Sequence, residues 1–242
     1  MIELANRVAV VTGASGGIGS SIALGLAAEG MRLCLLGRDE ARLQAVVQRA
    51  ESGRPAIRCY KADLTREQDL SAVAEAVGRD VPQVDVLVHA AACIDRGEIE
   101  STPVASLERQ YLTNVRGPYV LTQKLLPRLR ERGGQVVFIN STAGLDARGK
   151  LGAYAATKHA LKALADSLRD EVNAAGVRVL TLFLGRTATA MQKALCEWEG
   201  RPYRPELLLQ PEDVAAAVTF CLRLPRTAEV TEMRIRPLAK SY

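Results

Sequence analysis

Tyr154 and Lys158 stand four residues apart in the alanine-rich stretch A153-Y154-A155-A156-T157-K158. On a helix, residues at this spacing lie on one face, with their Cβ atoms about 5–6 Å apart. An ammonium group beside a phenol favours the phenolate, so it lowers the tyrosine pKa from its ordinary value of about 10. The pair could therefore act as a general acid/base toward a bound cofactor and substrate. The same spacing also occurs in ordinary helix packing, so other motifs in the chain are needed to distinguish a catalytic pair from a packing pair.

A glycine-rich loop provides a second chemical signal. The segment T12-G13-A14-S15-G16-G17-I18-G19 follows a predicted strand over 7–12 and opens a predicted helix over 17–29. Glycines let the backbone approach a pyrophosphate, and the helix N-terminus offers free N–H groups with a partial positive charge. The spacing differs from the common G-x-G-x-x-G, and the lysine of a P-loop is absent. Its position after the first strand predicts a dinucleotide site that includes Gly13, Gly17, Ile18 and Gly19.

The choice between NAD and NADP is predicted from the end of the second strand, 32–37, where the sequence is L36-G37-R38-D39. An acidic residue there binds the ribose 2′-hydroxyl of NAD, whereas an arginine accommodates the 2′-phosphate of NADP. Gly37 stands where the acid is expected, so we expect Arg38 to bind the phosphate, with Ser15 as a second donor. In the alternative interpretation, Arg38 is a solvated residue and Asp39 repels the phosphate. We expect Asp39 to cap the next helix instead.

Strands and helices alternate along the chain. Predicted strands cover 7–12, 32–37, 57–61, 84–89, 135–140, 178–184 and 230–235, and predicted helices cover 17–29, 40–50, 65–78, 104–132, 153–174 and 212–224. The helix over 65–78 has a possible capping box at Thr65 and Gln68, and the helix over 104–132 is expected to bend near Pro118. This order predicts a doubly wound α/β Rossmann fold with a parallel sheet of about seven strands and helices on both faces.

We predict one domain over 1–242, in which an irregular segment, 185–210, serves as the substrate loop. The chain is 48% hydrophobic and 24% charged, which is typical of a globular protein and not of a disordered one. Its net charge of +5 suits an anionic cofactor, but no basic stripe with interleaved aromatics indicates nucleic-acid binding.

Five separated cysteines and two histidines, with no C-x-x-C or H-E-x-x-H motif, argue against a zinc site or a disulfide framework. No metal is therefore expected. No apolar stretch approaches 18 residues and no signal segment precedes 8–11, so we expect no membrane partner and a cytoplasmic location.

Taken together, these motifs resemble those of the short-chain dehydrogenase/reductase family, from about residue 5 to the end. Its glycine motif T-G-x-x-x-G-x-G is matched by Thr12, Gly13, Gly17 and Gly19, and its Y-x-x-x-K by Tyr154 and Lys158. The resemblance implies a catalytic tetrad of Asn114 (in N114-V115-R116-G117), Ser141, Tyr154 and Lys158. It also implies contacts of Asp63 and Leu64 with adenine.

Three segments depart from the family pattern. H89-A90-A91-A92 replaces N-N-A-G, so we expect backbone groups of Ala90 at the cofactor ribose and His89 in place of one asparagine hydrogen bond. L184-G185-R186-T187-A188-T189 replaces P-G-x-x-x-T, and Gly185, Thr187 and Thr189 are expected at the nicotinamide and pyrophosphate. The C-terminal glycine pair is missing around Arg234–Leu238, which puts the family's tetramer contacts in doubt.

The resemblance implies an oxidoreductase that transfers a hydride between NADP(H) and a carbonyl or alcohol. Tyr154 would donate the proton, Ser141 would orient the carbonyl oxygen, Lys158 would bind ribose hydroxyls and lower the tyrosine pKa, and Asn114 would hold a relaying water. A non-catalytic NADP-binding regulatory protein is the alternative. The apolar residues near the site favour an apolar or aromatic ketone: Leu145, Leu151, Met191, Leu195 and Trp198. We expect Cys93 to be a small buried residue and His159 to lie at the surface.

The resemblance also implies that copies of this chain associate with one another. The helices over 104–132 and 153–174 are expected to pair two copies of the chain through apolar residues, namely Leu112, Leu161, Leu164 and Leu168. A homodimer or homotetramer follows. Arg128, Arg130 and Arg132 form either a solvated helix end or a docking site for an acidic carrier protein that delivers the substrate.

Overall fold

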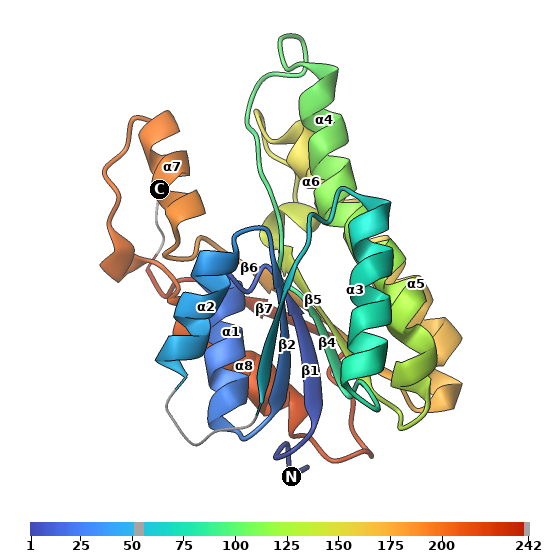
Figure 1. Cartoon of the computed structure of the whole chain (residues 1–242). Coiled ribbons are helices and arrows are strands. Elements are labelled where there is room, and N and C mark those ends of the chain that lie inside the picture. The colour runs from blue at the N-terminus through green and yellow to red at the C-terminus, as the bar shows by residue number, and fades with distance from the viewer. Residues whose placement is uncertain (51–55, 240–242) are drawn as a thin grey trace.

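Seven parallel strands form one twisted sheet in the order β3-β2-β1-β4-β5-β6-β7 (Figure 1). The computed structural model describes residues 1–50 and 56–239. The strands are β1 (Val8–Thr12), β2 (Arg32–Gly37), β3 (Ile57–Lys61), β4 (Val86–His89), β5 (Gln135–Ser141), β6 (Arg178–Leu184) and β7 (Glu232–Ile235). The predicted doubly wound parallel sheet is confirmed.

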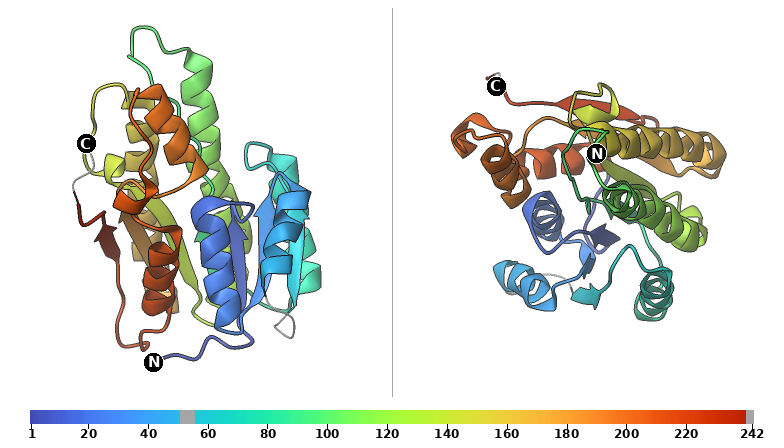
Figure 2. Two further views of the ribbon diagram at one scale, coloured as in Figure 1. Left: turned by 90° about the vertical axis from the view of Figure 1, so that its left-hand side faces the viewer. Right: turned by 90° about the horizontal axis from the view of Figure 1, so that it is seen from above.

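Helices cover both faces of the sheet, as the view from above in Figure 2 shows. The helices are α1 (Gly17–Ala28), α2 (Glu40–Arg49), α3 (Glu67–Asp80), α4 (Val104–Tyr111), α5 (Gly117–Arg130), α6 (Gly152–Val172), α7 (Ala190–Trp198) and α8 (Pro211–Leu222). One buried core joins the sheet to α1, α2 and α8, and the other joins it to α3, α5 and α6.

The side chains of β1 point alternately to the two faces of the sheet, and this explains why there are two cores. Ala9 and Val11 belong to the core beneath α1, whereas Val8 and Val10 belong to the core beneath α3 and α5. Successive side chains of a strand point to opposite faces, so a central strand covered on both sides is apolar throughout. All five residues of β1 are accordingly buried.

The strand order reverses between β1 and β4, and this point positions the site. In an open α/β sheet, the crevice outside the carboxyl ends of the strands at such a reversal binds ligands. The glycine loop after β1 and the segment after β4 approach closely there, because a Cβ on Gly13 would lie 2.7 Å from the Cα of Ala91. Gly13 also has a positive φ of 66°, which disfavours other residues.

Two local predictions about helices are wrong. The helix predicted to start at Thr65 begins at Glu67, and Thr65 donates instead to the Asp63 carboxylate from both its N–H and its hydroxyl, at 2.9 and 2.8 Å. The long helix over 104–132 is divided by a π-helical turn at Leu112–Arg116, so its irregularity precedes Pro118. Proline is tolerated at the start of α5, because the N–H groups of a first helical turn need no partner within the helix.

The predicted irregular segment 185–210 is more regular than expected. It contains α7 and a short 3₁₀ turn, η4 (Pro205–Leu207), and Thr189 caps α7 by accepting a hydrogen bond from the Gln192 N–H at 3.2 Å. Figure 1 shows α7 standing away from the sheet, above α1 and α2. None of the helices in the described ranges is both long and apolar enough to cross a membrane.

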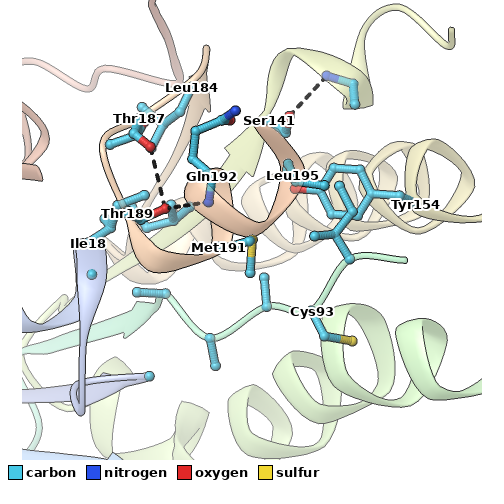
Figure 3. A pocket seen from close by; sticks show the side chains of 18 of the residues that line it. Ile18, Cys93, Ser141, Tyr154, Leu184, Thr187, Thr189, Met191, Gln192 and Leu195 are labelled. Carbon is cyan, nitrogen blue, oxygen red and sulfur yellow. Dashed lines mark hydrogen bonds between the residues drawn. The ribbon is translucent and has the colours of Figure 1, made fainter. Parts of the chain in front are cut away.

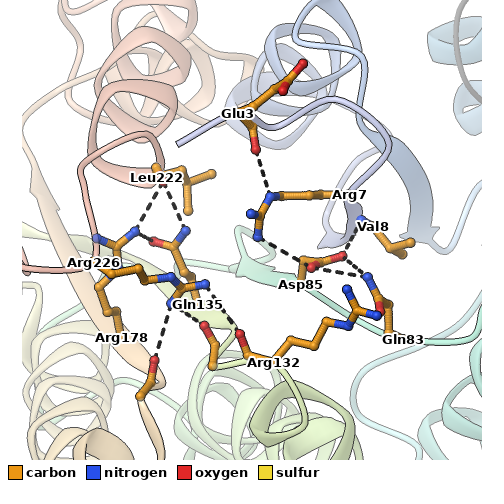
Figure 4. A network of polar contacts seen from close by, with 12 residues as sticks. Glu3, Arg7, Val8, Gln83, Asp85, Arg132, Gln135, Arg178, Leu222 and Arg226 are labelled. Atoms are coloured by element: carbon orange, nitrogen blue, oxygen red, sulfur yellow. Dashed lines mark hydrogen bonds and ion pairs between the residues drawn. The ribbon is translucent and has the colours of Figure 1, made fainter. Parts of the chain in front are cut away.

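A polar network closes the amino end of the sheet, opposite the crevice (Figure 4). The Asp85 carboxylate accepts from the Val8 N–H at 2.8 Å, and Arg178 donates to the Gln135 side chain at 2.7 Å. Arg132 lies in this network, just before β5. Arg132 is one of the three arginines predicted to form either a solvated helix end or a docking site for a carrier protein, and it lies at the amino end of the sheet.

Candidate active site

Tyr154 and Lys158 lie together on one face of α6, at the carboxyl end of β5. Their side chains are buried, with 9% and 2% of the residue surface exposed. The Lys158 Nζ atom is 5.7 Å from the centre of the Tyr154 ring and donates to the Ile139 carbonyl at 3.2 Å. A lysine this deeply buried is unusual, and its position between a strand carbonyl and a phenol indicates a specific role.

The predicted lowering of the tyrosine pKa does not occur in this structure. Burial raises the pKa of Tyr154 to about 12, with the nearby Ser141 hydroxyl acting in the opposite direction. Burial also lowers the pKa of Lys158 to about 8. Removing each group from water disfavours its charged form, and burial is the largest cause of both shifts.

Ser141 ends β5 and faces the same space as Tyr154 (Figure 3). Its hydroxyl accepts a hydrogen bond from the Ala143 N–H at 3.1 Å, which fixes its position. The Asn140 side chain supports both residues. Its Oδ1 atom accepts from the Ser141 N–H at 2.7 Å, and its Nδ2 atom donates to the Lys158 backbone carbonyl at 3.0 Å. Sequence reasoning missed Asn140, although it directly precedes the predicted serine.

Asn114 lies in the π-helical turn and does not face the cavity directly. Its amide oxygen accepts from the Cys93 N–H at 2.8 Å, and its nitrogen donates to the Cys93 carbonyl at 2.9 Å and the Thr157 hydroxyl at 3.1 Å. A π-helical turn inserts one residue into a helix and re-aims its side chains, often at functional sites. Asn114 thus joins the segment after β4 to α6.

A cavity of about 1270 Å³ runs from the glycine loop to Tyr154. Most predicted site residues line it: Gly13, Ser15, Gly17, Ile18, Arg38, Asp63, Leu64, Ala90, Ser141, Tyr154, Lys158, Gly185, Thr187 and Thr189. Gly19 lies behind the wall, where an added Cβ would overlap the backbone of Gly13. Among the residues that the structure describes, no group of three His, Cys, Asp or Glu side chains could hold a metal ion.

One end of the cavity is lined by Ser15, Gly37, Arg38 and Asp63. A Cβ on Gly37 would lie 3.1 Å from the Ser15 hydroxyl, so the two residues are in contact. Burial raises the pKa of Asp63, but hydrogen bonds from Thr65 and the charge of Arg38 lower it below its ordinary value overall. The Asp39 carboxylate accepts from the Arg42 N–H at 3.0 Å, so the predicted helix cap is present.

The middle of the cavity is closed by the segment after β6. The Thr187 hydroxyl donates to the Gly185 carbonyl at 3.1 Å, and a Cβ on Gly17 would meet the Thr189 methyl at 3.3 Å. The Ala90 N–H donates to the Thr12 hydroxyl at 3.1 Å, so this backbone group is bound within the protein. The space between these backbones is narrow and polar, which suits a pyrophosphate.

Apolar side chains lie beside Tyr154 at the other end of the cavity, and the cavity lining also includes charged residues: Arg96, Asp146, Arg148, Glu199 and Arg201. The apolar lining includes Ile94, Leu151, Met191 and Leu195. Cys93 also lines the cavity and is half-buried, whereas the sequence predicted a buried residue. Leu145 and Trp198, also predicted to line the pocket, are not part of its lining. Trp198 is 52% exposed, and the charged ends of Arg96 and Lys150 lie 4.9 and 6.0 Å from its ring centre. An apolar lining next to a buried phenol is suited to a largely apolar substrate.

An ion-pair cluster joins α7 to this end of the cavity. The buried Glu199 carboxylate pairs with Arg96, from the segment after β4, and with Arg186, from the segment after β6. Arg186 donates two hydrogen bonds to it at 2.8 Å. This cluster, Arg96–Glu199–Arg186, holds three separate segments around the substrate end and was not predicted.

Residues 7–200 match the family model described as short chain dehydrogenase. The chain belongs to the short-chain dehydrogenase family. Farnesol dehydrogenase of Aedes aegypti is 32% identical over 252 residues, covering 100% of both proteins. Among solved structures, an alcohol dehydrogenase from Thermococcus sibiricus complexed with 5-hydroxy-NADP is 26% identical, with a TM-score of 0.88 over 98% of this chain and 99% of that one. A 3-ketoacyl-(acyl-carrier-protein) reductase from Brucella melitensis complexed with NADH is 27% identical, with a TM-score of 0.84 over 96% and 97%.

This short-chain dehydrogenase has an unusual histidine behind its site. His89 is fully buried, stacks on Phe138 with ring centres 5.0 Å apart, and shares a hydrogen bond of 2.8 Å with the Thr122 hydroxyl of α5. Burial lowers its pKa to about 3, so the ring is neutral at physiological pH. His89 thus joins the sheet to α5, in keeping with the expected replacement of an asparagine hydrogen bond. His159 lies at the surface as predicted.

Proposed function

We propose that this short-chain dehydrogenase transfers a hydride between NADP(H) and a carbonyl or alcohol substrate, with Tyr154 as general acid/base. The observation that carries the proposal is the convergence of Ser141, Tyr154 and Lys158 on the wall of a cavity that begins at the glycine loop. A bound nicotinamide would supply or accept the hydride. Gly13, Gly17, Gly185 and Thr187 would hold the dinucleotide along the cavity floor.

The side chains of the site can supply the proton that the carbonyl oxygen needs when it is reduced. At neutral pH, Tyr154 carries its proton, because burial raises its pKa to about 12, and it can donate that proton to a carbonyl oxygen. The Ser141 hydroxyl would hydrogen-bond the same oxygen and orient it. Lys158 would remain charged below pH of about 8 and stabilise the phenolate that forms. Asn114 would act as a positioning residue, because it holds the backbone of Cys93 beside the reacting groups.

The preference for NADP(H) over NAD(H) rests on Arg38, Ser15 and the absence of an acid at Gly37. Relatives of this chain have been crystallised with either type of cofactor, so the family alone does not decide. A charge-assisted contact with a phosphate contributes about 1.5–3 kcal/mol. Since about 1.4 kcal/mol corresponds to a factor of ten, NADPH should be favoured roughly tenfold to a hundredfold.

The selectivity is tested by kcat/KM for both cofactors in the wild type and in Arg38→Leu. The variant should lose most of the NADPH preference, because it removes the charge facing the phosphate. Adding Gly37→Asp should invert the preference, although the new side chain has to displace Ser15 and Leu43 by a few tenths of an ångström. A wild type that uses NADH equally well would contradict the assignment of Arg38.

Catalysis itself is tested with Tyr154→Phe. Loss of the general acid should lower kcat by at least about a hundredfold with a panel of ketones, monitored by NADPH absorbance. NADPH binding, measured by fluorescence titration, should change little. If no ketone, quinone, steroid or acyl thioester is turned over by the wild type while NADPH still binds, the alternative of a regulatory NADP-binding protein gains support.

The substrate is proposed to be an apolar or aromatic ketone, or the corresponding alcohol. The apolar lining near Tyr154 supports this class, and a relative named for farnesol is consistent with it. We further propose one domain over 1–242, with 185–210 as the substrate loop. Docking of a substrate-carrying protein on Arg128, Arg130 and Arg132 stays a prediction from the sequence. A cytoplasmic location stays a prediction from the sequence.

We also propose that two copies associate, as a homodimer or within a homotetramer. Leu161 is buried in the core of its own chain, so it cannot contribute to the interface as predicted. Exposed apolar residues do occur on the predicted helix pair: Val104, Leu107, Tyr111 and Tyr119. Light scattering at micromolar concentration should give at least twice the mass of 26.1 kDa.

A further inference from the structure

Arg42 lies over the glycine loop, in a position that neither the proposed function nor the sequence motifs assign. A Cβ built on Gly16 would lie 2.6 Å from a terminal nitrogen of the Arg42 guanidinium and 3.5 Å from its central carbon. Arg42 also lines the same cavity as Ser15, Gly37 and Arg38. A second cation therefore faces the adenosine end of the site.

The fold explains how Arg42 reaches this point. It lies in the first turn of α2, just after the Asp39 cap, and its own N–H donates to that cap. Side chains on a helix lean toward the N-terminus, so an arginine in the first turn projects beyond the end of the helix. The N-terminal end of α2 follows β2 directly, and the glycine loop follows the neighbouring strand β1.

Arg38 and Arg42 approach this end of the cavity from different directions. The charge of Arg38 acts on Asp63, which follows β3, whereas the guanidinium of Arg42 lies against Gly16, in the loop after β1. Ser15 and Gly37 are in contact and lie in the same part of the wall. A phosphate monoester carries up to two negative charges and several acceptor oxygens, so two guanidinium groups can bind it from two sides.

We propose that Arg42 is a second specificity-determining residue, which binds the 2′-phosphate of NADP(H) opposite Arg38. The proposal rests on the NADP(H) preference proposed above and assigns a second residue to it. The glycine at position 16 then has a purpose beyond the backbone turn, because any side chain there would displace the Arg42 guanidinium. Arg42 could instead bind the pyrophosphate or the adenine ring, which NADH also contains, and the experiment separates these cases.

Isothermal titration of the intact protein with 2′,5′-ADP and with 5′-AMP tests the assignment without catalysis. These probes differ only in the 2′-phosphate. Arg42→Gln should weaken 2′,5′-ADP about tenfold, since a partly exposed charge-assisted contact contributes about 1.4 kcal/mol. Binding of 5′-AMP should change by less than about twofold. NADPH and NADH, titrated in the same way, should show the same contrast.

Two further variants serve as a control and as a second test. Arg49→Gln removes the same charge from the last turn of α2, about 10 Å along the helix, and should leave both affinities unchanged. Gly16→Ala keeps the charge but displaces the guanidinium, so it should weaken 2′,5′-ADP selectively and by less than Arg42→Gln. The backbone at Gly16 is extended, with φ 173° and ψ 172°, so alanine is compatible with it.

The outcomes are distinct. Equal weakening of 2′,5′-ADP and 5′-AMP by Arg42→Gln would assign Arg42 to a part of the cofactor common to both and overturn the proposal. Unchanged affinity for 2′,5′-ADP would overturn it as well. A wild type that binds both probes equally would instead contradict the NADP(H) preference itself, and this inference with it. A selective loss in Arg38→Gln but not in Arg42→Gln would uphold the proposed function and reject only the role of Arg42.

Discussion

The two ends of the cavity are built in different ways. The cofactor end is formed by the backbone of the glycine loop and of the segment after β4, which approach so closely that a Cβ on Gly13 would be 2.7 Å from Ala91. The substrate end is formed by side chains of α7 and two segments, joined through Arg96–Glu199–Arg186. One end depends on how near two backbones come, and the other on the charges that join separate segments.

This difference indicates where the molecule tolerates change. Backbone groups at contact distance cannot adapt to one added methyl group without moving the sheet that carries them. Side chains that pair across a loop can be exchanged, and the segments that they hold can shift. We therefore expect substitutions of the closely packed Gly13 and Gly19 at the cofactor end to change ligand affinity by large factors. Substitutions of the paired side chains at the substrate end should change it by smaller factors.

The largest effect is expected for Gly19→Ala. The added Cβ would overlap the carbonyl of Gly13, so the glycine loop has to rearrange. Affinity for NADPH should fall at least about a hundredfold, or about 2.7 kcal/mol, as fluorescence titration would measure. Gly25→Ala, on the same helix, is the matched control, because its Cβ would make an ordinary contact of 3.4 Å with Ala215. Similar losses in both variants would show that α1 is disturbed generally.

The second prediction concerns Lys158, at the junction of the two ends. Burial lowers its folded-state pKa to about 8, below the ordinary 10.5, so the unfolded chain binds the proton more tightly. Stability should therefore rise as the pH increases from about 8 to about 10.5. At pH 7 the buried ammonium of Lys158 destabilises the folded state by about 3 kcal/mol, and Lys158→Met removes this effect. The variant also loses a hydrogen bond worth about 1 kcal/mol, so its free energy of unfolding at pH 7 should be about 2 kcal/mol higher than that of the wild type.

Denaturant unfolding and turnover, measured on the same Lys158→Met preparation, test this directly. The variant should be more stable and yet inactive with every ketone. Lys162→Met is the control, because Lys162 is partly exposed and pairs with Asp166 and Glu232, so its loss should not stabilise the fold. A Lys158→Met protein that is less stable at pH 7 than the wild type would show that the buried ammonium is well solvated by its surroundings.

A smaller effect is expected for Glu199→Gln at the substrate end. The substitution removes the charge that Arg96 and Arg186 share, so α7 should be held less firmly. The KM for the ketone should rise about tenfold, corresponding to about 1.4 kcal/mol, while NADPH affinity stays the same. Glu197→Gln, an exposed residue on the same helix, should change neither value. An equal change in ketone KM and NADPH affinity would remove the distinction between the two ends.

Features that depend on local spacing could be predicted from the sequence. The glycine loop, the Asp39 cap and the helical pairing of Tyr154 with Lys158 each involve residues within a few positions of one another. The alternation of strands and helices likewise predicted the sheet, because each apolar strand needs helices on both faces.

Features that depend on distant residues could not be predicted in this way. Arg96 and Glu199 are 103 positions apart, and only the folded chain shows that they pair. The position of Arg42 over Gly16 likewise needs the relative placement of two neighbouring βα units. The rise in the Tyr154 pKa was missed because the sequence shows which charges are near but not how much water the fold excludes.

The strand β7 forms one edge of the sheet, and its composition bears on aggregation. An edge strand has unpaired backbone groups along one side, which can recruit a strand from another molecule. Glu232 and Arg234 are exposed and alternate with Met233 and Ile235, which pack against the core. Charges at these two positions discourage edge-to-edge pairing, because a second copy would have to bring its own charges into the new sheet. The strand at this edge of the fold therefore also carries charges that oppose its pairing with the same edge of a second copy.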